Sequence, residues 1–151
     1  MKASELMTRD PKTCEPDHDL LCAIRIMKEE DTGIVPVTKG NGQARVVGVV
    51  TDRDIALQLG ARDVRPSDVK VGDVMSTEVV SARPEADVTE VSRKMQEAQV
   101  RRVLVVDDGS LVGIISTADL ARASSRKEGR LSEEVESVIE KVSEDTGSTR
   151  A

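Results

Sequence analysis

The sequence contains no Phe, Tyr or Trp among its 151 residues. Its core must therefore be built from Val, Ile, Leu, Ala and Met, which can still reach the packing density of protein interiors. The absence also excludes aromatic stacking platforms, the usual device for holding single-stranded nucleic acid. With a net charge of -6, the chain also lacks the basic balance of a protein that binds the phosphate backbone. We therefore expect no nucleic-acid partner.

Long apolar runs are missing as well. No run approaches the roughly 18–20 residues that a membrane-spanning helix needs. The amino-terminal segment, with acidic Glu5 and Asp10, lacks the apolar stretch of a signal peptide. The sequence therefore predicts a cytoplasmic protein with no membrane partner.

Recognisable redox, metal and catalytic motifs are also missing. Cys14 and Cys22 lack the C-x-x-C spacing of redox or zinc sites, so we expect free, reduced thiols and no metal. His18 is the only histidine and is most simply a surface loop residue. No Ser-His-Asp, Cys-His or paired-carboxylate set can be assembled. We therefore expect no catalytic residues and no enzyme activity.

What the sequence does contain is a repeat. Residues 3–38 superpose on residues 71–106 without a gap, and after a short slip residues 48–54 match residues 113–119. A unit of about 65–68 residues is marginal by itself and cannot bury its apolar face alone. The sequence therefore predicts one module made of two halves.

Both copies predict the same order of elements, β-α-β-β-α. Apolar residues at helical spacing predict a first helix after Asp19 and its twin after Asp87, where Glu90 completes a capping-box spacing. β-branched runs separated by Gly-bearing turns predict two strands in each copy, followed by a second helix. These runs are residues 34–37 and 46–50 in the first copy, and 103–106 and 111–115 in the second. The expected fold is α/β (α+β), with tandem repeats related by a pseudo-two-fold axis.

The expected boundaries follow the repeat. Residues 1–62 form the first copy, 63–70 a linker, 71–124 the second copy, and 125–151 a carboxyl-terminal helix with a mobile tail. Within that last segment, residues 131–142 carry apolar side chains on one side of a helix and have no counterpart in the first copy. Such a helix could pack on its own module, contact a second copy, or fray.

Each copy places a hydroxyl three residues before a carboxylate, where a strand passes into a helix. The pairs are Thr51 with Asp54, and Ser116 with Asp119. One interpretation is helix capping, worth about 1 kcal/mol in each copy. The other is a ligand site, because helix amides and a hydroxyl suit a phosphate oxygen, and a carboxylate can accept hydrogen bonds from the hydroxyls of a ribose. The spacing fits both.

The repeated Gly-h-h-Thr/Ser-x-x-Asp motif, the Met-bearing segments 6–7 and 74–75, and the strand Ile-Val-Pro-Val together resemble a CBS-domain pair, also called a Bateman module. The resemblance spans roughly residues 3–124. Residues 47–55 are especially similar to stand-alone bacterial members, including the hypoxic-response type. It implies a regulatory signal-transduction module that binds AMP, ADP or ATP, with NAD and S-adenosylmethionine as alternatives and no required cofactor. It also implies a homodimer and an unidentified effector protein.

The family pattern further implies a role for each position of the motif. Asp54 and Asp119 would hold ribose hydroxyls, while Thr51 and Ser116 would approach the ribose or phosphate. The residues implied to form the two clefts are Thr32, Gly33, Val49, Thr51, Arg53 and Asp54 in the first copy, and Val100, Arg101, Ile114, Ser116, Ala118 and Asp119 in the second.

The two copies differ most in their basic residues. The first has Arg53 where the second has Ala118, and the second has Arg101 where the first has Gly33. Arginine suits phosphate because of its bidentate fork. Arg53 could equally be solvated, and Arg101 could pair with a nearby aspartate. We therefore expect two clefts of similar shape, of which one is preferred by the ligand. A degenerate pair that acts as a structural interaction module, with empty clefts, is the alternative function.

Overall fold

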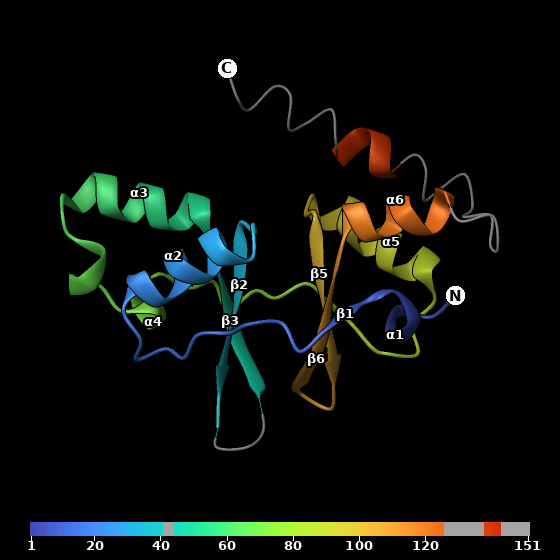
Figure 1. Cartoon of the computed structure of the whole chain (residues 1–151), viewed down its shortest axis with the longest axis horizontal. Helices are drawn as coiled ribbons and strands as arrows, with labels where there is room; N and C mark the ends of the chain where they lie inside the picture. The colour runs from blue at the N-terminus through green and yellow to red at the C-terminus, as the bar shows by residue number, and fades with distance from the viewer. Residues whose placement is uncertain (41–43, 126–137, 143–151) are drawn as a thin grey trace. The chain divides into compact units, whose positions relative to one another are not determined.

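The computed structural model describes residues 1–40, 44–125 and 138–142 and divides them into two compact units (Figure 1). Unit 1 comprises residues 1–10, 80–107 and the described part of 112–151; unit 2 comprises residues 11–79 and 108–111. The units are therefore not the sequence repeats. Residues 1–10 of the first repeat belong with the second, and residues 71–79 of the second belong with the first. The repeats exchange their opening segments.

Unit 2 is built around an antiparallel hairpin of β2 (Ile34–Lys39) and β3 (Arg45–Thr51). Val35 lies opposite Val50 in this hairpin, and both are fully buried. The remaining elements are α2 (Leu20–Glu29), α3 (Asp52–Arg62), the 3₁₀ helix η1 (Pro66–Asp68) and α4 (Val71–Val74). The core of unit 2 is aliphatic, as the absence of aromatic residues requires, and comprises Cys14, Leu20, Ala23, Val35, Val37, Val50, Ile55, Val69 and Val71.

The segment expected to be a linker, residues 63–70, is packed on unit 2. It contains η1, and Val69 is only 2% exposed. The Leu20 amide donates a hydrogen bond to the Val69 carbonyl at 2.9 Å. Proline and charged residues hid this role, because a single buried side chain leaves no periodic signal in the sequence.

Unit 1 has the same kind of architecture as unit 2. It combines the opening segment of the first repeat with most of the second repeat. Its sheet runs in the order β6-β5-β4, and β1 pairs antiparallel with β6. The elements are α1 (Ala3–Leu6), β1 (Thr8–Arg9), β4 (Ser81–Ala82), α5 (Val88–Ala98), β5 (Arg102–Asp107), β6 (Ser110–Ser116) and α6 (Thr117–Ser125), the first two residues of β6 being counted with unit 2. The predicted helices and the two later strands of each copy are thus present. The extended piece expected at residues 12–14 is not a strand and contributes one isolated bridge, between Cys14 and Val37.

The start of α5 differs in detail from the sequence prediction. The Asp87 carboxylate accepts a hydrogen bond from the Thr89 amide at 2.9 Å, so Asp87 does cap the helix. The Glu90 side chain does not close a capping box. It lies instead 3.7 Å from the Lys94 ammonium, one helical turn further on. An opposite charge at this spacing competes with the backbone amide for the carboxylate.

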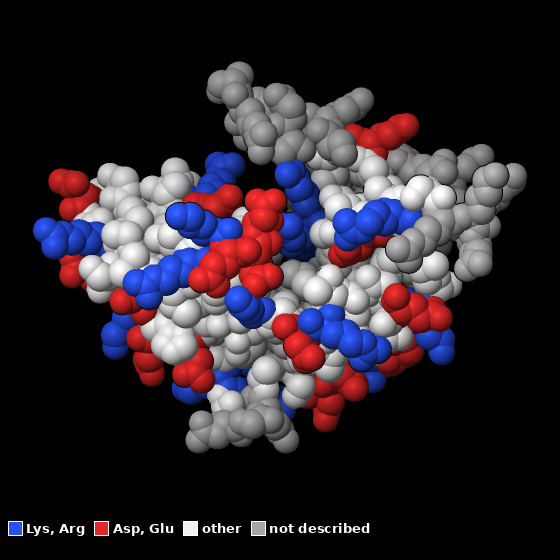
Figure 2. Space-filling model, in the orientation of Figure 1, with Lys and Arg blue, Asp and Glu red and all other residues white. Residues whose placement is uncertain are grey.

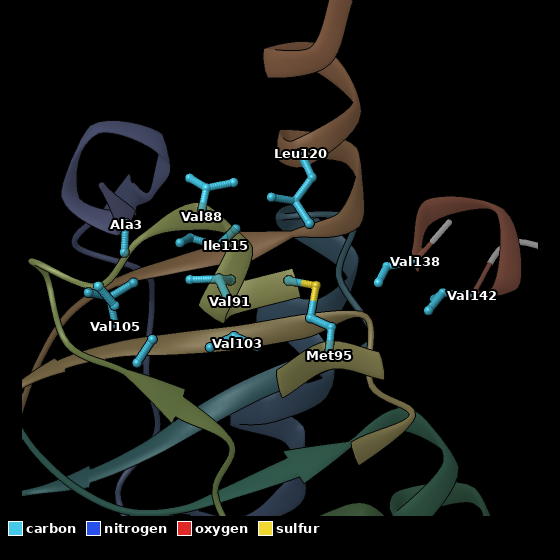
Figure 3. Packing of buried hydrophobic residues seen from close by; sticks show 12 residues of the cluster. Ala3, Val88, Val91, Met95, Val103, Val105, Ile115, Leu120, Val138 and Val142 are labelled. Atoms are coloured by element: carbon cyan, nitrogen blue, oxygen red, sulfur yellow. The ribbon is translucent and has the colours of Figure 1, made fainter. Parts of the chain in front are cut away.

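Residues 138–142 are helical and pack on unit 1. Val138 and Val142 are buried in its core cluster. Figure 3 shows both side chains on the side of this short piece that faces Met95 and Leu120. This packing is what the first of the three interpretations expects of the carboxyl-terminal helix. Residues 131–137 of that predicted helix, and the tail after residue 142, lie outside the described residues.

A methionine covers a strand glycine in each unit. A Cβ built on Gly48 would lie 3.0 Å from the Met75 sulfur and 2.7 Å from the Ser76 carbonyl oxygen. A Cβ on Gly113 would overlap Met7. Only glycine admits such a close approach. The repeated Met and Gly positions therefore belong to contacts in which the opening segment of one repeat covers a strand of the other.

Among the described residues, none of the helices combines the length and the apolar character needed to span a bilayer.

Candidate functional site

The first copy of the motif begins α3. Thr51 is the last residue of β3 and the N-cap of the helix, and its hydroxyl accepts a hydrogen bond from the Asp54 amide at 3.1 Å. The Thr51 hydroxyl therefore caps the helix. The Asp54 carboxylate does not take part in this cap, and it makes no hydrogen bond or ion pair with any residue that the structure describes.

A loop lies against the start of α3. The Asp52 amide donates to the Gly33 carbonyl at 2.9 Å, and a Cβ on Gly33 would lie 3.0 Å from the Asp52 carboxylate. The Thr32 hydroxyl lies 3.1 Å from the Ile34 carbonyl oxygen, to which it donates. These contacts bring the predicted loop residues and the predicted helix residues together. We call Thr32, Gly33, Val49, Thr51, Arg53 and Asp54 the α3 site.

The amides of the first turn of α3 are not free for a phosphate. The Asp52 amide is bonded to Gly33 and the Asp54 amide to Thr51, as described above, while the Arg53 amide lies 2.8 Å from an Asp52 carboxylate oxygen. The idea that helix amides alone hold an anion here is therefore not supported. The Arg53 side chain is exposed and forms no ion pair within the described part of the chain, so it is the cation available to a phosphate.

Val49, which was expected to line the first cleft, is buried. It is 8% exposed and lies opposite Pro36 in the hairpin. Its amide donates to the Ser76 carbonyl at 2.9 Å, and its carbonyl accepts from the Ser76 amide at 2.8 Å. The sequence did not point to Ser76, because that residue comes from the opening segment of the other repeat.

The second copy of the motif begins α6 and uses its carboxylate differently. The Ser116 amide donates to Asp119 Oδ2 at 2.8 Å, and the Asp119 amide donates to the Ser116 hydroxyl at 3.2 Å. The other oxygen, Asp119 Oδ1, pairs with the Arg122 guanidinium. Only 11% of the Asp119 side chain is exposed. Both oxygens of this carboxylate therefore already have partners.

The other predicted residues of the second copy lie around this helix start. The Arg101 carbonyl accepts from the Thr117 amide at 3.0 Å, just as Gly33 does in the first copy. The Arg101 side chain is exposed, and it pairs with neither Asp107 nor Asp108 in the part of the chain that the structure covers. We call Val100, Arg101, Ile114, Ser116, Ala118 and Asp119 the α6 site.

One residue explains part of the difference between the two carboxylates. Arg122 stands three residues after Asp119, on the same face of α6, whereas Leu57 stands three residues after Asp54. Leu57 is 59% exposed and offers no charge. The carboxylate of the α6 site is therefore neutralised within its own helix, while that of the α3 site has no ion pair among the described residues.

The structure also brings together three residues that the sequence analysis did not group. The sulfur atoms of Cys14 and Cys22 lie 2.8 Å apart, and Nδ1 of His18 lies 3.5 Å from the Cys22 sulfur. Burial raises the pKa of the Cys14 thiol, and the nearby Cys22 raises it further. These cysteines do not have the C-x-x-C spacing considered above. The signal for the group is the spacing C-x-x-x-H-x-x-x-C, whose members can meet around the start of a helix.

Figure 2 shows acidic and basic side chains interspersed over one face of the molecule. Among the described residues of this face, neither sign forms a continuous stripe. A surface of this kind differs from the basic face of a general nucleic-acid binder.

Comparisons with known proteins cover most of the chain. The family model for the CBS domain matches residues 3–60 and 71–126. The CBS domain-containing protein YhcV of Bacillus subtilis (strain 168) is 38% identical over 117 residues, which are 78% of this chain and 81% of the relative. Hypoxic response protein 1 of Mycobacterium tuberculosis (strain ATCC 25618 / H37Rv) is 34% identical over 111 residues, 73% of this chain and 76% of the relative.

Solved structures agree with the sequence relatives. CBSX2, crystallised in complex with AMP, has a TM-score of 0.70 and 26% identity, and the match covers 85% of this chain and 98% of that one. Hypoxic Response Protein I, solved with two coordinated zinc ions, has a TM-score of 0.72 and 31% identity, with coverage of 81% and 98%.

Proposed function

Because the chain belongs to the CBS-domain family and carries two CBS domains, we propose that it is a regulatory module that binds an adenine nucleotide at the α3 site. The observation that carries the proposal is the Asp54 carboxylate, which lies at the start of α3 without a partner among the described residues. A carboxylate in this position can accept hydrogen bonds from both hydroxyls of a ribose. CBSX2, a structural relative, was crystallised with AMP.

The remaining residues of the α3 site suit the other parts of a nucleotide. Arg53 offers an exposed guanidinium that can take a phosphate in a bidentate geometry. The loop at Thr32 and Gly33, with Val49 of β3, would receive the base. Since the chain has no aromatic residue, adenine must be held between aliphatic side chains and read by backbone groups. AMP, ADP and ATP all fit this description, and NAD and S-adenosylmethionine remain alternatives.

The function that we propose is binding and not catalysis. The relative YhcV is a CBS domain-containing protein of which this chain covers 81%. A nucleotide that contacts the module more favourably in one conformation shifts the population toward that conformation. We propose that the occupied module acts in the cytoplasm through a homodimer contact or an effector protein.

Two measurements test nucleotide binding. Since the chain has no Trp or Tyr, it absorbs little near 280 nm, and co-purified nucleotide would give an unobscured band near 260 nm. Melting temperatures measured with AMP, ADP, ATP, NAD and S-adenosylmethionine should rise for at least one of them, because a ligand that binds only the folded state stabilises it. If no band appears and no compound raises the melting temperature, the degenerate interaction module is the correct function.

A pair of variants tests the assignment of the α3 site. Asp54→Asn removes the carboxylate while keeping the size of the side chain, and it should weaken nucleotide binding by roughly 10–100-fold, the value of a hydrogen bond to a charged group. Asp63→Asn is the matched control, because it removes the same charge at the other end of α3, where a left-handed backbone suits Asn. Equal affinities in the two variants would show that Asp54 does not hold the ribose.

A further inference from the structure

We propose that Cys14, His18 and Cys22 form a binding site for a thiophilic divalent cation such as Zn²⁺. We call these three residues the Cys-His-Cys cluster. One donor atom from each residue lies within 4.8 Å of the other two. The site lies entirely within unit 2 and is separate from the α3 site, and this proposal does not depend on nucleotide binding.

The distances between the donor atoms are those of a site that needs little rearrangement. In a tetrahedral zinc site with Zn–S bonds of about 2.3 Å, two sulfur ligands lie about 3.7 Å apart. The sulfur atoms of Cys14 and Cys22 lie 2.8 Å apart, closer than this but well beyond the roughly 2.05 Å of a disulfide bond. The separation of 3.5 Å between His18 Nδ1 and the Cys22 sulfur already matches a shared ion. An opening of about 1 Å between the two sulfur atoms would admit the ion.

The chemistry of the donors selects the kind of metal. Two thiolates and one imidazole are soft and borderline ligands, which favour Zn²⁺ and related transition ions over Mg²⁺ or Ca²⁺. Two thiolates also balance the charge of a divalent ion. With three protein ligands, a fourth position stays open for water or another donor.

The backbone around the cluster is fixed by contacts from two directions. The Cys14 amide donates to the Pro36 carbonyl at 3.1 Å, and its carbonyl accepts from the Thr38 amide at 2.9 Å. The His18 carbonyl accepts from the Val71 amide at 2.8 Å. These bonds tie one ligand to β2 and the next to the start of α4, so the loop does not have to be ordered when the ion binds.

Glu15 lies near the place of the outer partner that a metal-binding histidine normally has. Its carboxylate lies 3.8 Å from His18 Nε2, the ring nitrogen away from the sulfur atoms, which is just beyond hydrogen-bond distance. A carboxylate that closes this gap when the ion binds would fix the tautomer that leaves Nδ1 as the ligand. In the structure, Nδ1 accepts a hydrogen bond from the Glu15 amide at 3.1 Å, and a bound ion would take the place of this amide. The His18 side chain is 48% exposed, which gives the ion a path from solvent.

Cobalt(II) is a suitable probe of the cluster. The full-length protein, reduced and freed of metal by chelation, is titrated with Co²⁺ under anaerobic conditions. We expect saturation at one ion per chain, with a thiolate-to-cobalt charge-transfer band in the near ultraviolet and the visible bands of a tetrahedral site. The near ultraviolet is clear, because the chain has no Trp or Tyr. Zn²⁺ should then displace the cobalt and raise the melting temperature.

Variants of His18 and Cys22, the two ligands that are not fully buried, test whether the cobalt binds at this cluster. Cys22→Ser and His18→Gln should each weaken Co²⁺ binding by more than the roughly 10–100-fold that the loss of an outer partner costs. Glu15→Gln should weaken it by about 10-fold or more for that reason. Asp17→Asn, which removes a charge from the same exposed loop without removing a ligand, should change little.

Three results would overturn the assignment. The first is a reduced protein that gives no charge-transfer band with Co²⁺. The second is a band that persists unchanged in both Cys22→Ser and His18→Gln. The third is a pair of cysteines that air converts to a disulfide, measured as a loss of titratable thiols, in a protein whose reduced form binds no Co²⁺; the cluster would then be a thiol pair and not a metal site.

Discussion

The first turns of α3 and α6 carry the same two side chains at the same spacing and use them differently. In α6 the carboxylate of Asp119 accepts the Ser116 amide and pairs with Arg122, and its side chain is 11% exposed. In α3 the carboxylate of Asp54 is bonded to none of the described residues. One copy therefore uses its aspartate to hold the fold together, and the other leaves it available for a ligand. The duplicated motif keeps the two capping hydroxyls, while the partners of the carboxylate differ, one of them being Arg122 one turn later.

The largest effect on stability that we expect from this comparison is at Asp119. Asp119→Ala leaves the Ser116 amide without its acceptor in a partly buried place, and should lower the free energy of unfolding by roughly 1–3 kcal/mol. Asp54→Ala should change it by no more than about 0.5 kcal/mol, because no contact is lost. Urea unfolding followed by circular dichroism would measure both. If Asp54→Ala destabilises the protein as much as Asp119→Ala, the two carboxylates do not differ as we describe.

A second comparison concerns the two covered glycines. A Cβ at Gly48 would lie 2.7 Å from the Ser76 carbonyl oxygen and 3.0 Å from the Met75 sulfur, whereas the three atoms nearest to a Cβ at Gly113 all belong to Met7 and include the Met7 Cβ at 2.9 Å. Because the Met7 Cβ moves only with its backbone, a side-chain rotation alone relieves neither overlap. We expect each Gly→Ala substitution to cost about 1–3 kcal/mol, the typical cost of overpacking. Thermal melts of the two variants would measure both costs, and a variant that melts like the unchanged protein would show that the methionine does not cover that glycine closely.

The smallest expected effect comes from exchanging the residues that follow the two carboxylates. Leu57→Arg places an arginine three residues after Asp54, which should weaken nucleotide binding by about two- to threefold, as expected for an exposed ion pair. Leu57→Gln is the matched control, since it changes polarity without adding charge. Arg122→Leu should release one oxygen of Asp119. Titration of AMP against these variants tests the exchange, and an affinity that is the same in Leu57→Arg and Leu57→Gln would argue against neutralisation by Arg122 as the cause of the asymmetry.

The starts of the first helices offer one further contrast, this time in pH. The Thr89 amide and hydroxyl hold the pKa of Asp87 below its usual range. A carboxyl whose pKa is lowered by folding adds stability above its unfolded pKa, and that stability is lost as the pH falls through the folded value. Asp19, the N-cap of α2, makes no side-chain cap hydrogen bond. Asp87→Asn should therefore flatten the acid limb of the stability curve, measured by thermal melts across pH, and an acid limb that this variant leaves unchanged would contradict the role of Asp87.

Much of the fold could be predicted from the sequence because its signals are local. The β-branched runs that became β2, β3, β5 and β6 are apolar enough to be recognised without a partner. The exchange of opening segments could not be predicted, because it depends on Met7 covering Gly113 and Met75 covering Gly48, contacts between residues far apart in the chain. The same limit hid the packing of Val69 in the segment expected to be a linker.

The position of the two motifs at helix starts could be predicted from the sequence. The partners of their two carboxylates could not. The motif spacing located Thr51 and Ser116 at two helix starts, where both hydroxyls cap. The state of each carboxylate depends partly on the residue three positions later, which the sequence shows as Leu57 and Arg122, and partly on the Ser116 amide bond, which the sequence does not show. The grouping of Cys14 with His18 and Cys22 was harder to foresee, because Cys14 is fixed by its backbone bonds to β2.

The most direct test of the account is the number of AMP molecules that one chain binds, measured by isothermal titration calorimetry on the intact protein and on Asp119→Asn. We predict one dominant site per chain, which Asp119→Asn retains. Two sites of equal affinity, or a dominant site that Asp119→Asn abolishes in a protein that is still folded, would contradict it.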